Sequence, residues 1–584
     1  YIKYVASAGH IYFAGSELMK RALSILTACV MLLCAAVPAF AANEEIPLIT
    51  VGGYASSQLY DYSGDEPQQV WPFDPQAALK QTASDLPNFT ISLLKFLCGS
   101  SESLGNAVAD GGMKILEKMF CNEDGSSVYN VNHYPNDPAL TNYKYLTDSG
   151  RLDLVREKNL SAAAAERIGG ENVFSFQYDF RMGGYDIANE LSDYVNAVLK
   201  YTGAKKVNIF GMSYGGFVVG AYLSLFADSA PINNAVLDVP ALGGTSFAKR
   251  FFLGEVDFPV ASLISLGENI LGKETDLAPL FDGVKLPRVE ALASAFLKRI
   301  SVLPLHWGSL WDLLTPESYE QLKPVMLDGE ASAELIRKSD VIHHEIMPNY
   351  RSSFLRCMER GANVSIICNY VDYTAFGGDR LADMLLDASQ VSGAICPSVG
   401  KRFPRGYSAV RTVCTDIKHD HVAPSMKIDA SSAYLPENTW FVDGQYHGTY
   451  TQDPNTFALI ERLLFADGRT DVYSFAEFPQ FEVAQAPYYS VNAVFKGEQA
   501  GHTGDSDTLI ITNLSLSRSV LITGVSMPGV EFSKPSGRLL KPGESAEIKV
   551  ISAKPLDGRA ELKVSYVKPA FGKSAAVRSF DFVK

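Results

Sequence analysis

The sequence has no dominant low-complexity bias and no surplus of basic residues. Its 584 residues are 47% hydrophobic and 11% aromatic. That is enough apolar material for a buried core, which excludes a disordered, collagen-like or coiled-coil chain. Lys and Arg number 51 against 65 Asp and Glu, a formal net charge of -14. Because phosphate binding needs a surplus of cations on one face, this balance argues against a nucleic-acid partner.

The apolar run near the amino terminus is too short to span a membrane. A basic segment at residues 19–21 precedes the apolar run, residues 22–37, and residues 38–41 read Pro-Ala-Phe-Ala. A transmembrane helix needs about 20 apolar residues, whereas a shorter run followed by a small-x-small pattern is typical of a signal peptide. The sequence therefore predicts cleavage after Ala41, with residues 1–18 as an upstream extension, and an exported protein, periplasmic or extracellular.

Cysteine is scarce, with 8 in the whole chain. Cys29 and Cys34 lie within the predicted signal peptide, so an even number remains. An even number of cysteines in an exported chain makes disulfides plausible. Pairing between sequence neighbours is the simplest arrangement, and unpaired buried thiols are the alternative. The remaining cysteines are Cys98, Cys121, Cys357, Cys368, Cys396 and Cys414.

Apolar runs alternate with helical patterns through most of the mature chain. A continuous apolar run is typical of a strand buried on both faces of a parallel sheet. The alternation predicts an α/β fold over residues 42–484, with a mostly parallel sheet flanked by helices. The expected strands are 46–51, 173–176, 207–210, 235–237, 364–368 and 440–442, and the expected helices are 186–201, 216–227, 381–386 and 455–465.

Two regions depart from this alternation. Residues 245–350 are rich in helical patterns, such as the amphipathic stretch 288–300, so we expect a helical cap inserted over the sheet. Residues 485–584 contain short β-type segments separated by turn signals, which predicts a small immunoglobulin-like β-sandwich that serves for stability or as a spacer. The β-type segments are 508–512, 520–525, 546–551 and 561–566.

Residues 211–215, which read Gly-Met-Ser-Tyr-Gly, carry the clearest chemical signal. Alone, a G-x-S-x-G match arises by chance roughly 0.3 times in a chain of this length. Here it follows the apolar run 206–210 and leads directly into a helical pattern. A strand, a sharp turn and a helix are the context of a nucleophile elbow, where glycines allow the backbones to approach. We therefore predict that Ser213 is a nucleophile above the carboxyl edge of the sheet.

A serine nucleophile needs a histidine base, and that base needs an orienting acid. His447 follows the last expected core strand and precedes the helical pattern at 455–465, the position of the base in this fold. His419 and His421 precede that strand in a charged segment that favours a solvated loop or, less favoured, a metal-binding pair. His447 is therefore the predicted base.

The orienting acid has several candidates. Four aspartates follow the apolar run 364–368, and Asp238 ends the run after the elbow helix. Each of them also fits a surface or helix-capping carboxylate. The residues alone leave this choice open. The four are Asp372, Asp379, Asp383 and Asp387.

Three stretches resemble a known family. Residues 51–59 read Val-Gly-Gly-Tyr-Ala-Ser-Ser-Gln-Leu, residues 178–181 read Tyr-Asp-Phe-Arg before the elbow, and residues 239–244 read Val-Pro-Ala-Leu-Gly-Gly after it. Over roughly residues 45–466 the chain resembles the lecithin:cholesterol acyltransferase-like branch of the α/β-hydrolases. The resemblance implies an α/β-hydrolase fold and a lipase or acyltransferase activity.

The resemblance also implies particular site residues. The family has its acid in a Gly-Asp-Gly-Thr-Val-like segment after the penultimate strand, and the matching position is Asp383, although neither flanking glycine is present. Asp238 and Asp379 remain alternatives. The backbone N–H groups of Tyr54 and Tyr214 are implied as oxyanion donors, in agreement with the need of a tetrahedral intermediate for preorganised donors.

The expected activity is that of an exported serine esterase or lipase. His447 takes the proton of Ser213, the serine attacks an ester carbonyl, and water resolves the acyl-enzyme. No metal or organic cofactor is needed. Acyl transfer to an alcohol and a noncatalytic exported binding protein are the alternatives. Asp179 and Arg181 are either substrate-binding residues or a buried ion pair.

The expected partner is an ester or lipid substrate. Without residues 1–41 the chain has 48 basic and 64 acidic side chains, a net charge of -16. This charge argues against electrostatic adhesion to anionic membranes, so we expect any transient contact with a lipid surface to involve apolar groups around the cap. The sequence does not indicate an oligomeric state.

Overall fold

The computed structural model describes most of the residues between 45 and 484 and the strands near the carboxyl end. The expected signal peptide, Cys98, Asp372 and most of the stretch 288–300 lie outside the described residues. The described ranges are 45–72, 106, 109–110, 113–114, 116–255, 295, 302–371, 379–484, 491–495, 508–513, 520–533, 539–541, 544–553, 558–568 and 572–582.

A seven-stranded sheet lies at the centre of the α/β region. Its strand order is β10-β9-β8-β7-β6-β1-β5, and every neighbouring pair is parallel. The parallel sheet expected from the continuous apolar runs is therefore confirmed. The strands are β1 (Leu48–Val51), β5 (Val173–Phe176), β6 (Val207–Met212), β7 (Ile232–Asp238), β8 (Asn363–Tyr370), β9 (Thr439–Asp443) and β10 (Phe481–Val483).

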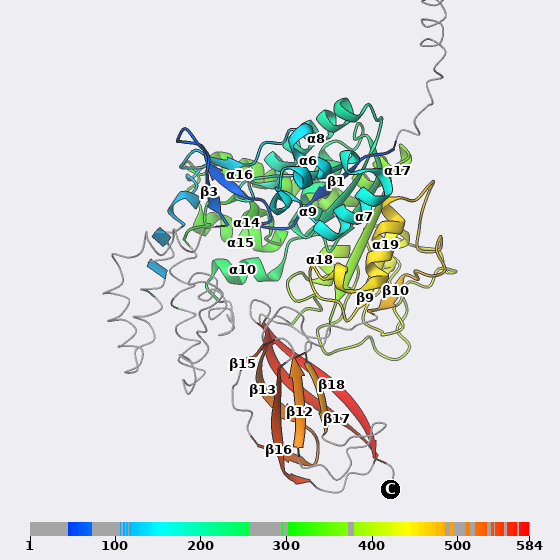
Figure 1. Ribbon diagram of the computed structural model, residues 1–584. Coiled ribbons are helices and arrows are strands. Elements are labelled where there is room, and N and C mark those ends of the chain that lie inside the picture. The colour runs from blue at the N-terminus through cyan, green and yellow to red at the C-terminus, as the bar shows by residue number, and fades with distance from the viewer. Residues whose placement is uncertain are drawn as a thin grey trace, which may run out of the picture. The chain divides into compact units, whose positions relative to one another are not determined.

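Helices cover both faces of this sheet (Figure 1). Val51 and Ile366 belong to a core shared with α8, α9 and α17. Leu48 and Trp440, which point to the opposite face, belong to a core shared with α7 and α19. Burial on both faces explains why these strands are mostly apolar instead of alternating between apolar and polar residues. The helices are α7 (Lys158–Ile168), α8 (Gly184–Thr202), α9 (Tyr214–Leu225), α17 (Tyr350–Glu359) and α19 (Pro454–Leu464).

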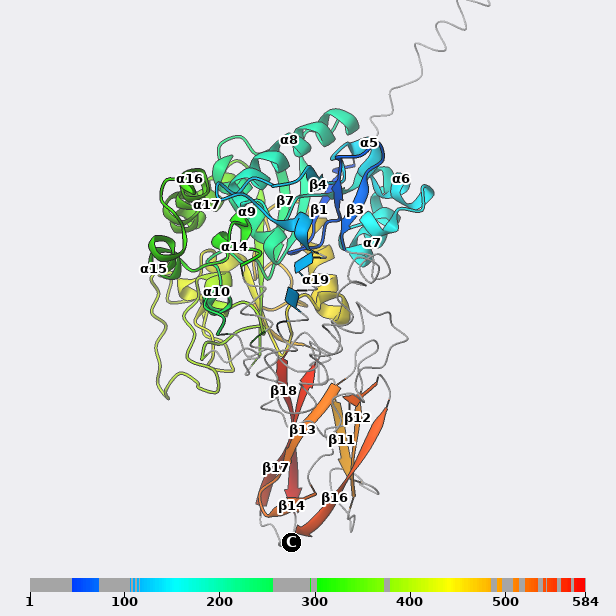
Figure 2. The same ribbon diagram turned by 90° about the vertical axis from the view of Figure 1, so that its left-hand side faces the viewer.

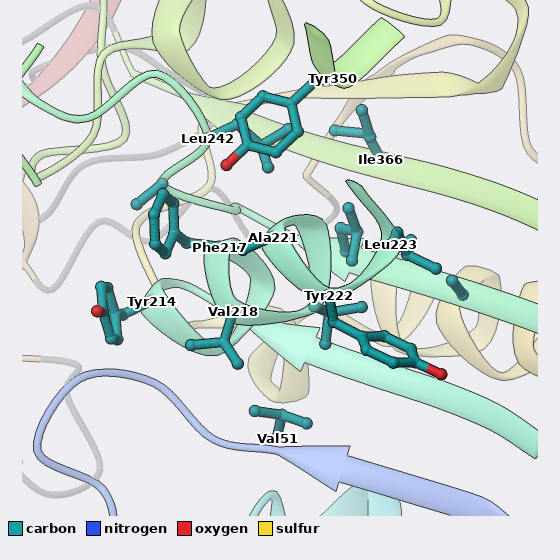
Figure 3. Close-up of a cluster of buried hydrophobic side chains, with 14 of the residues drawn as sticks. Val51, Tyr214, Phe217, Val218, Ala221, Tyr222, Leu223, Leu242, Tyr350 and Ile366 are labelled. Atoms are coloured by element: carbon teal, nitrogen blue, oxygen red, sulfur yellow. The ribbon is translucent and has the colours of Figure 1, made fainter. Parts of the chain in front are cut away.

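The helix α9, which begins directly after Ser213, is apolar on all sides. Its residues from Tyr214 to Leu223 are all buried. Figure 3 shows side chains of this helix, among them Val218, between Val51 of β1 and Tyr350 of α17. A helix enclosed in this way has little freedom to shift, because protein interiors are close-packed. The packing therefore fixes the position of the Ser213 backbone.

The prediction of a helix at residues 381–386 is wrong. Residues 381–387 form a loop with isolated bridges from Ala382 to Val371 and to Asp387. The Asp383 carboxylate accepts the backbone N–H groups of the residues that follow it, and Met384 has a φ of 99°. Aspartate side chains compete with helical hydrogen bonds in this way, and a positive φ is incompatible with a right-handed helix.

The described parts of residues 245–350 are mostly helical, and the cap that we expect there stays a prediction. A small antiparallel sheet, β3-β2-β4, is formed by three short strands between residues 59 and 133, and two of them, β3 and β4, are labelled in Figure 2. None of the helices within the described ranges is both long enough and apolar enough to cross a membrane. The helices are α10 (Ser246–Phe252), α14 (Gly308–Asp312), α15 (Pro316–Met326) and α16 (Ala333–Asp340), and the strands are β2 (Leu59–Asp61), β3 (Gln68–Trp71) and β4 (Val131–His133).

The carboxyl-terminal strands form two antiparallel sheets around one core. The orders are β11-β12-β16-β14 and β15-β13-β17-β18. Leu509 and Ile511 from the first sheet share a hydrophobic core with Ile522 and Val564 from the second. Two sheets with a common core form a β-sandwich, as expected. The strands are β11 (Val491–Phe495), β12 (Thr508–Asn513), β13 (Val520–Ser526), β14 (Val530–Phe532), β15 (Leu539–Leu540), β16 (Ser545–Ala553), β17 (Gly558–Lys568) and β18 (Gly572–Phe582).

The described cysteines are free thiols, which corrects the expectation of disulfides between sequence neighbours. Cys357 on α17 faces α9, where its Sγ lies 3.5 Å from the carbonyl oxygen of Leu223. Cys368 lies in β8, with its Sγ 3.6 Å from the carbonyl oxygen of Ala388. The two thiols thus point into separate packing environments, and burial raises their pKa. The described free cysteines also include Cys121, Cys396 and Cys414.

Candidate active site

Ser213 lies at a sharp turn between β6 and α9. Its backbone angles are φ 59° and ψ -123°, a combination that L-residues rarely adopt. A β-carbon at Gly215 would lie 2.4 Å from the carbonyl oxygens of Val51 and Gly52, so only glycine fits where the helix meets β1. The strained turn and the close approach together give the strand, sharp turn and helix geometry expected from the sequence.

His447 lies between Ser213 and Asp383. Its Nε2 is 2.8 Å from Ser213 Oγ, and its Nδ1 is 2.7 Å from Oδ2 of Asp383. The other carboxylate oxygen, Oδ1, accepts the N–H groups of Leu385 and Leu386 at 3.0 and 2.9 Å. The Asp383 side chain is fully buried, and the His447 side chain is 10% exposed. The backbone therefore holds the carboxylate, and the carboxylate orients the imidazole toward the serine.

These three side chains come from loops that follow different strands. Ser213 follows β6, Asp383 lies in the connection after β8, and His447 follows β9. Because the strands are parallel, their carboxyl ends meet at one edge of the sheet. The N–H of His447 also donates to the carbonyl oxygen of Asp383 at 3.0 Å. The sheet thus brings together residues that are far apart in the sequence.

The other acid candidates lie elsewhere. Asp238 ends β7 beneath the elbow, and its carbonyl oxygen accepts the N–H of Ser213 at 2.9 Å. Neither of its carboxyl oxygens has a hydrogen-bond partner among the described residues. Burial, with added repulsion from Glu157 and Asp383, raises the pKa of Asp238 well above its ordinary value.

Asp379 and Asp387 also differ from Asp383 in their surroundings. Asp379 is exposed. The Asp387 carboxylate accepts the N–H and the hydroxyl of Ser246, both at 3.1 Å, at the start of α10. Asp383 is thus the acid candidate whose carboxylate contacts His447.

The loop after β1 places Tyr54 near the nucleophile. A β-carbon at Gly53 would lie 3.2 Å from Ser213 Cβ, so the two backbone segments are in contact. Within the part of the chain that the structure describes, no acceptor is hydrogen-bonded to the backbone N–H of Tyr54 or Tyr214. Such groups can donate to an oxyanion, and Tyr214 is also the first residue of α9, where the helix dipole favours negative charge.

Tyr178 holds the loop that follows β1. Its hydroxyl lies 2.7 Å from the carbonyl oxygen of Gly52 and 2.8 Å from that of Gly53. The rings of Tyr54 and Tyr214 pack edge to face, with centroids 5.5 Å apart. Tyr178 belongs to the Tyr-Asp-Phe-Arg segment noted in the sequence, but its role in holding the loop was not predicted. The segment itself was the signal that could have identified it.

Asp312 on α14 contacts the side chain that follows the nucleophile. Its Oδ2 accepts the hydroxyl of Tyr214 at 2.9 Å and the N–H of Gly184 at 2.5 Å. Burial raises the pKa of Asp312 to about 7, although these two hydrogen bonds act in the opposite direction. Sequence reasoning missed Asp312, because nothing in its local sequence points to a partner more than a hundred residues away in the chain.

Asp179 and Arg181 form a buried ion pair. The Arg181 Nε and Nη2 donate to the two oxygens of Asp179 at 2.9 and 2.6 Å. Nη2 also donates to the carbonyl oxygen of Val131 in β4 at 3.1 Å. Their side chains are 6% and 0% exposed. Of the two interpretations of this segment, the contacts favour the structural ion pair.

Three solved structures show a distant likeness to the chain, whereas no family model and no curated protein matches it. The Tle4–Tli4 complex is 12% identical over 56% of this chain and 75% of that chain, with a TM-score of 0.24. Phospholipase PlaB from Legionella pneumophila is 10% identical over 72% of this chain and 87% of that chain, with a TM-score of 0.27. PlaB in complex with thio-NAD is 10% identical over 73% of this chain and 84% of that chain, with a TM-score of 0.27.

Likenesses with such low TM-scores carry no argument for activity. The α/β-hydrolase fold of this chain follows from its own sheet order and from the strand, turn and helix around Ser213. The narrower resemblance to the lecithin:cholesterol acyltransferase-like branch stays a prediction.

Proposed function

We propose that the protein is an exported serine hydrolase that cleaves carboxylic esters of lipids. The observation that carries this proposal is the hydrogen-bonded chain from Ser213 Oγ through His447 to Asp383, with distances of 2.8 and 2.7 Å. The order of Ser, Asp and His along the chain is that of α/β-hydrolases. The sequence resemblance supports a lipid substrate.

In the proposed reaction, His447 Nε2 accepts the hydroxyl proton as Ser213 Oγ attacks the ester carbonyl carbon. Asp383 keeps the imidazole proton on Nδ1 and stabilises the imidazolium that forms. The backbone N–H groups of Tyr54 and Tyr214 donate to the oxyanion. His447 then protonates the departing alcohol, which leaves an acyl-enzyme on Ser213. A water molecule attacks this ester by the same steps in reverse, and the free acid departs.

A fluorophosphonate probe tests the nucleophile. The full-length protein should be labelled at one serine, and Ser213→Ala should abolish the labelling. The matched control is Ser149→Ala, which removes an exposed hydroxyl at the end of helix Tyr143–Asp148 and should label as the wild type does. Equal labelling of wild type and Ser213→Ala, or a folded wild type that takes up no probe, would overturn the proposal.

Two further assays on the same protein test which acyl chain length is preferred and whether water or an alcohol accepts the acyl group. p-Nitrophenyl esters of increasing acyl length should show rising kcat/KM, because a longer chain buries more apolar area, at about 25 cal/mol per Å². A flat profile, or a preference for acetate, contradicts a lipid substrate.

Adding a long-chain alcohol should leave the free acid as the main product. An ester as the main product would show an acyltransferase instead.

A further inference from the structure

Four potential metal ligands meet at a place that the proposed reaction does not use. One ligand atom from each of Cys414, His419, His421 and Glu437 lies within 4.8 Å of every other. The Nδ1 of His419 is 3.5 Å from Cys414 Sγ and 3.0 Å from Glu437 Oε1. His447, not His419 or His421, is hydrogen-bonded to Ser213. The charged Lys-His-Asp-His segment is therefore part of a side-chain cluster and not simply a solvated loop.

His421 has a ring nitrogen that is buried without a partner. Its side chain is fully buried, and Nε2 has no hydrogen-bond partner among the described residues. The other nitrogen, Nδ1, lies 2.7 Å from Oε1 of Gln480. Because an amide oxygen can only accept, this contact puts the ring proton on Nδ1 and leaves a lone pair on Nε2. An outer hydrogen bond of this kind is the usual way to orient a metal-ligating histidine.

Around His419 the contacts also fit a cation. A single ring nitrogen, Nδ1, faces both a thiol and a carboxylate, but it can share a proton with only one of them at a time. Zinc bonds of about 2.0 to 2.3 Å in a tetrahedron place neighbouring ligand atoms about 3.3 to 3.6 Å apart. The distances from Nδ1 to Cys414 Sγ and to Glu437 Oε1, 3.5 and 3.0 Å, are close to these separations.

We propose that Cys414, His419, His421 and Glu437 bind a structural zinc ion. One thiolate, two neutral imidazoles and one carboxylate are ligands that zinc prefers, and four protein ligands leave no open position for catalysis. The charges of the thiolate and the carboxylate together balance the dication, which lowers the cost of holding it in a partly buried place. Binding releases the proton of the Cys414 thiol to solvent.

The zinc ion would link the long connection between β8 and β9 to the residues directly before β9. Cys414 and His421 lie between β8 and β9, and their backbones are held by Ser431 and Ala430 through bonds of 2.9 and 2.8 Å. Glu437 lies in the short helix directly before β9, while Gln480 precedes β10. Four bonds to one ion would thus fix a connection that has few helices or strands among its described residues, just ahead of β9, the strand that His447 follows.

Metal content and absorption spectra test the site. The full chain, purified without a metal-affinity tag, should retain about one zinc per molecule after dialysis, as a closed four-ligand site does. Replacement by Co²⁺ should give a thiolate-to-cobalt charge-transfer band and the strong visible bands of tetrahedral cobalt. Cys414→Ser should remove the charge-transfer band, and His421→Gln should weaken zinc binding at least about 100-fold, beyond the effect of losing an outer hydrogen bond.

Two controls separate this site from others. His344→Gln alters the second group of potential ligands, Glu320, Asp340 and His344, and Cys396→Ser removes a free cysteine outside the cluster; both should keep the zinc. If the buried His421 variant does not fold, Glu437→Gln serves instead, because that side chain is 44% exposed. A wild type that takes up no zinc, or loss of zinc in His344→Gln but not in the cluster variants, overturns the proposal.

Discussion

The acid beside His447 is the site residue that depends most on three-dimensional structure. Several aspartates follow β8 or end β7, and their sequence contexts do not separate them. The fold does so, because Asp383 presents one oxygen to two backbone N–H groups and the other to the imidazole. Asp238 is buried but has no hydrogen-bond partner for its carboxyl group among the described residues. Asp383, and not Asp238, is therefore in a position to orient the imidazole.

We therefore expect Asp383→Asn to lower kcat by about 10³- to 10⁴-fold, because an amide beside Nδ1 favours the wrong tautomer. Initial rates on a soluble ester measure this change. The matched variant is Asp238→Asn, which should retain most of the activity, since the Asp238 carboxyl makes no hydrogen bond to His447 or to any other described residue. The reverse result, a large loss in Asp238→Asn and a small one in Asp383→Asn, would reassign the acid.

At the scale of elements, a buried carboxyl connects α14 to the first residue of α9. Asp312 accepts the Tyr214 hydroxyl and the first N–H of α8, so three helices meet at one side chain. Burial raises the pKa of Asp312 to about 7. In the unfolded chain the same group has a pKa of about 3.9. Between these two values the folded protein holds a proton that the unfolded chain has released.

This proton makes stability depend on pH. Where the folded state binds more protons than the unfolded state, the free energy of unfolding falls as pH rises. From about pH 4 to pH 7 the wild type should lose about 1.4 kcal/mol per pH unit relative to Asp312→Asn, and above pH 7 the difference should stay constant. Urea unfolding of both proteins across this range measures the difference. If the free energy of unfolding changed with pH in the same way in both proteins, the result would contradict a protonated Asp312 in the folded state between about pH 4 and pH 7.

The loop at 381–387 shows why one element was predicted wrongly. Its leucines and methionine favour a helix, and sequence propensity alone gives no reason to break it. The Asp383 carboxylate instead binds the N–H groups of Leu385 and Leu386, and this local competition stops a helix from forming. The same bonds orient the acid toward His447, so the sequence feature that defeated the secondary-structure prediction is part of the candidate site.

At the scale of the whole molecule, the chain contains separate hydrophobic cores. The cores on the two faces of the parallel sheet share no residue with the core of the β-sandwich. Segments with independent cores unfold independently unless a large interface couples them. We propose that the boundary near residue 485 is a domain boundary on this ground.

Calorimetry of the full chain should then show two unfolding transitions. Leu562→Ala in β17 and Leu459→Ala in α19 each remove a buried side chain, with 1% and 0% exposure. Each substitution should cost about 2–5 kcal/mol, and each should lower the temperature of only its own transition. A single transition that both substitutions shift equally would show that the two parts unfold as one unit.

The fold could be predicted largely from the sequence, whereas the contacts around the site could not. Continuous apolar runs located the core strands, and the order of motifs along the chain singled out Ser213 and His447. Local patterns do not report which side chains meet across the fold. Tyr178 and Asp312 act on Gly52 and Tyr214 through contacts between residues 126 and 98 positions apart in the sequence. The free thiols Cys357 and Cys368 likewise depend on the directions in which their helix and strand present them.

The separation of Ser213 and His447, 234 positions apart in the sequence, also has a consequence for synthesis. A nascent chain carries the nucleophile for most of the time that it is being translated, but it has no base until the loop after β9 has emerged from the ribosome. Under the proposed mechanism, any product of premature termination before residue 447 would therefore be inert toward esters. If the chain is an esterase as proposed, the order of the strands delays its activity until almost the whole α/β region has been made.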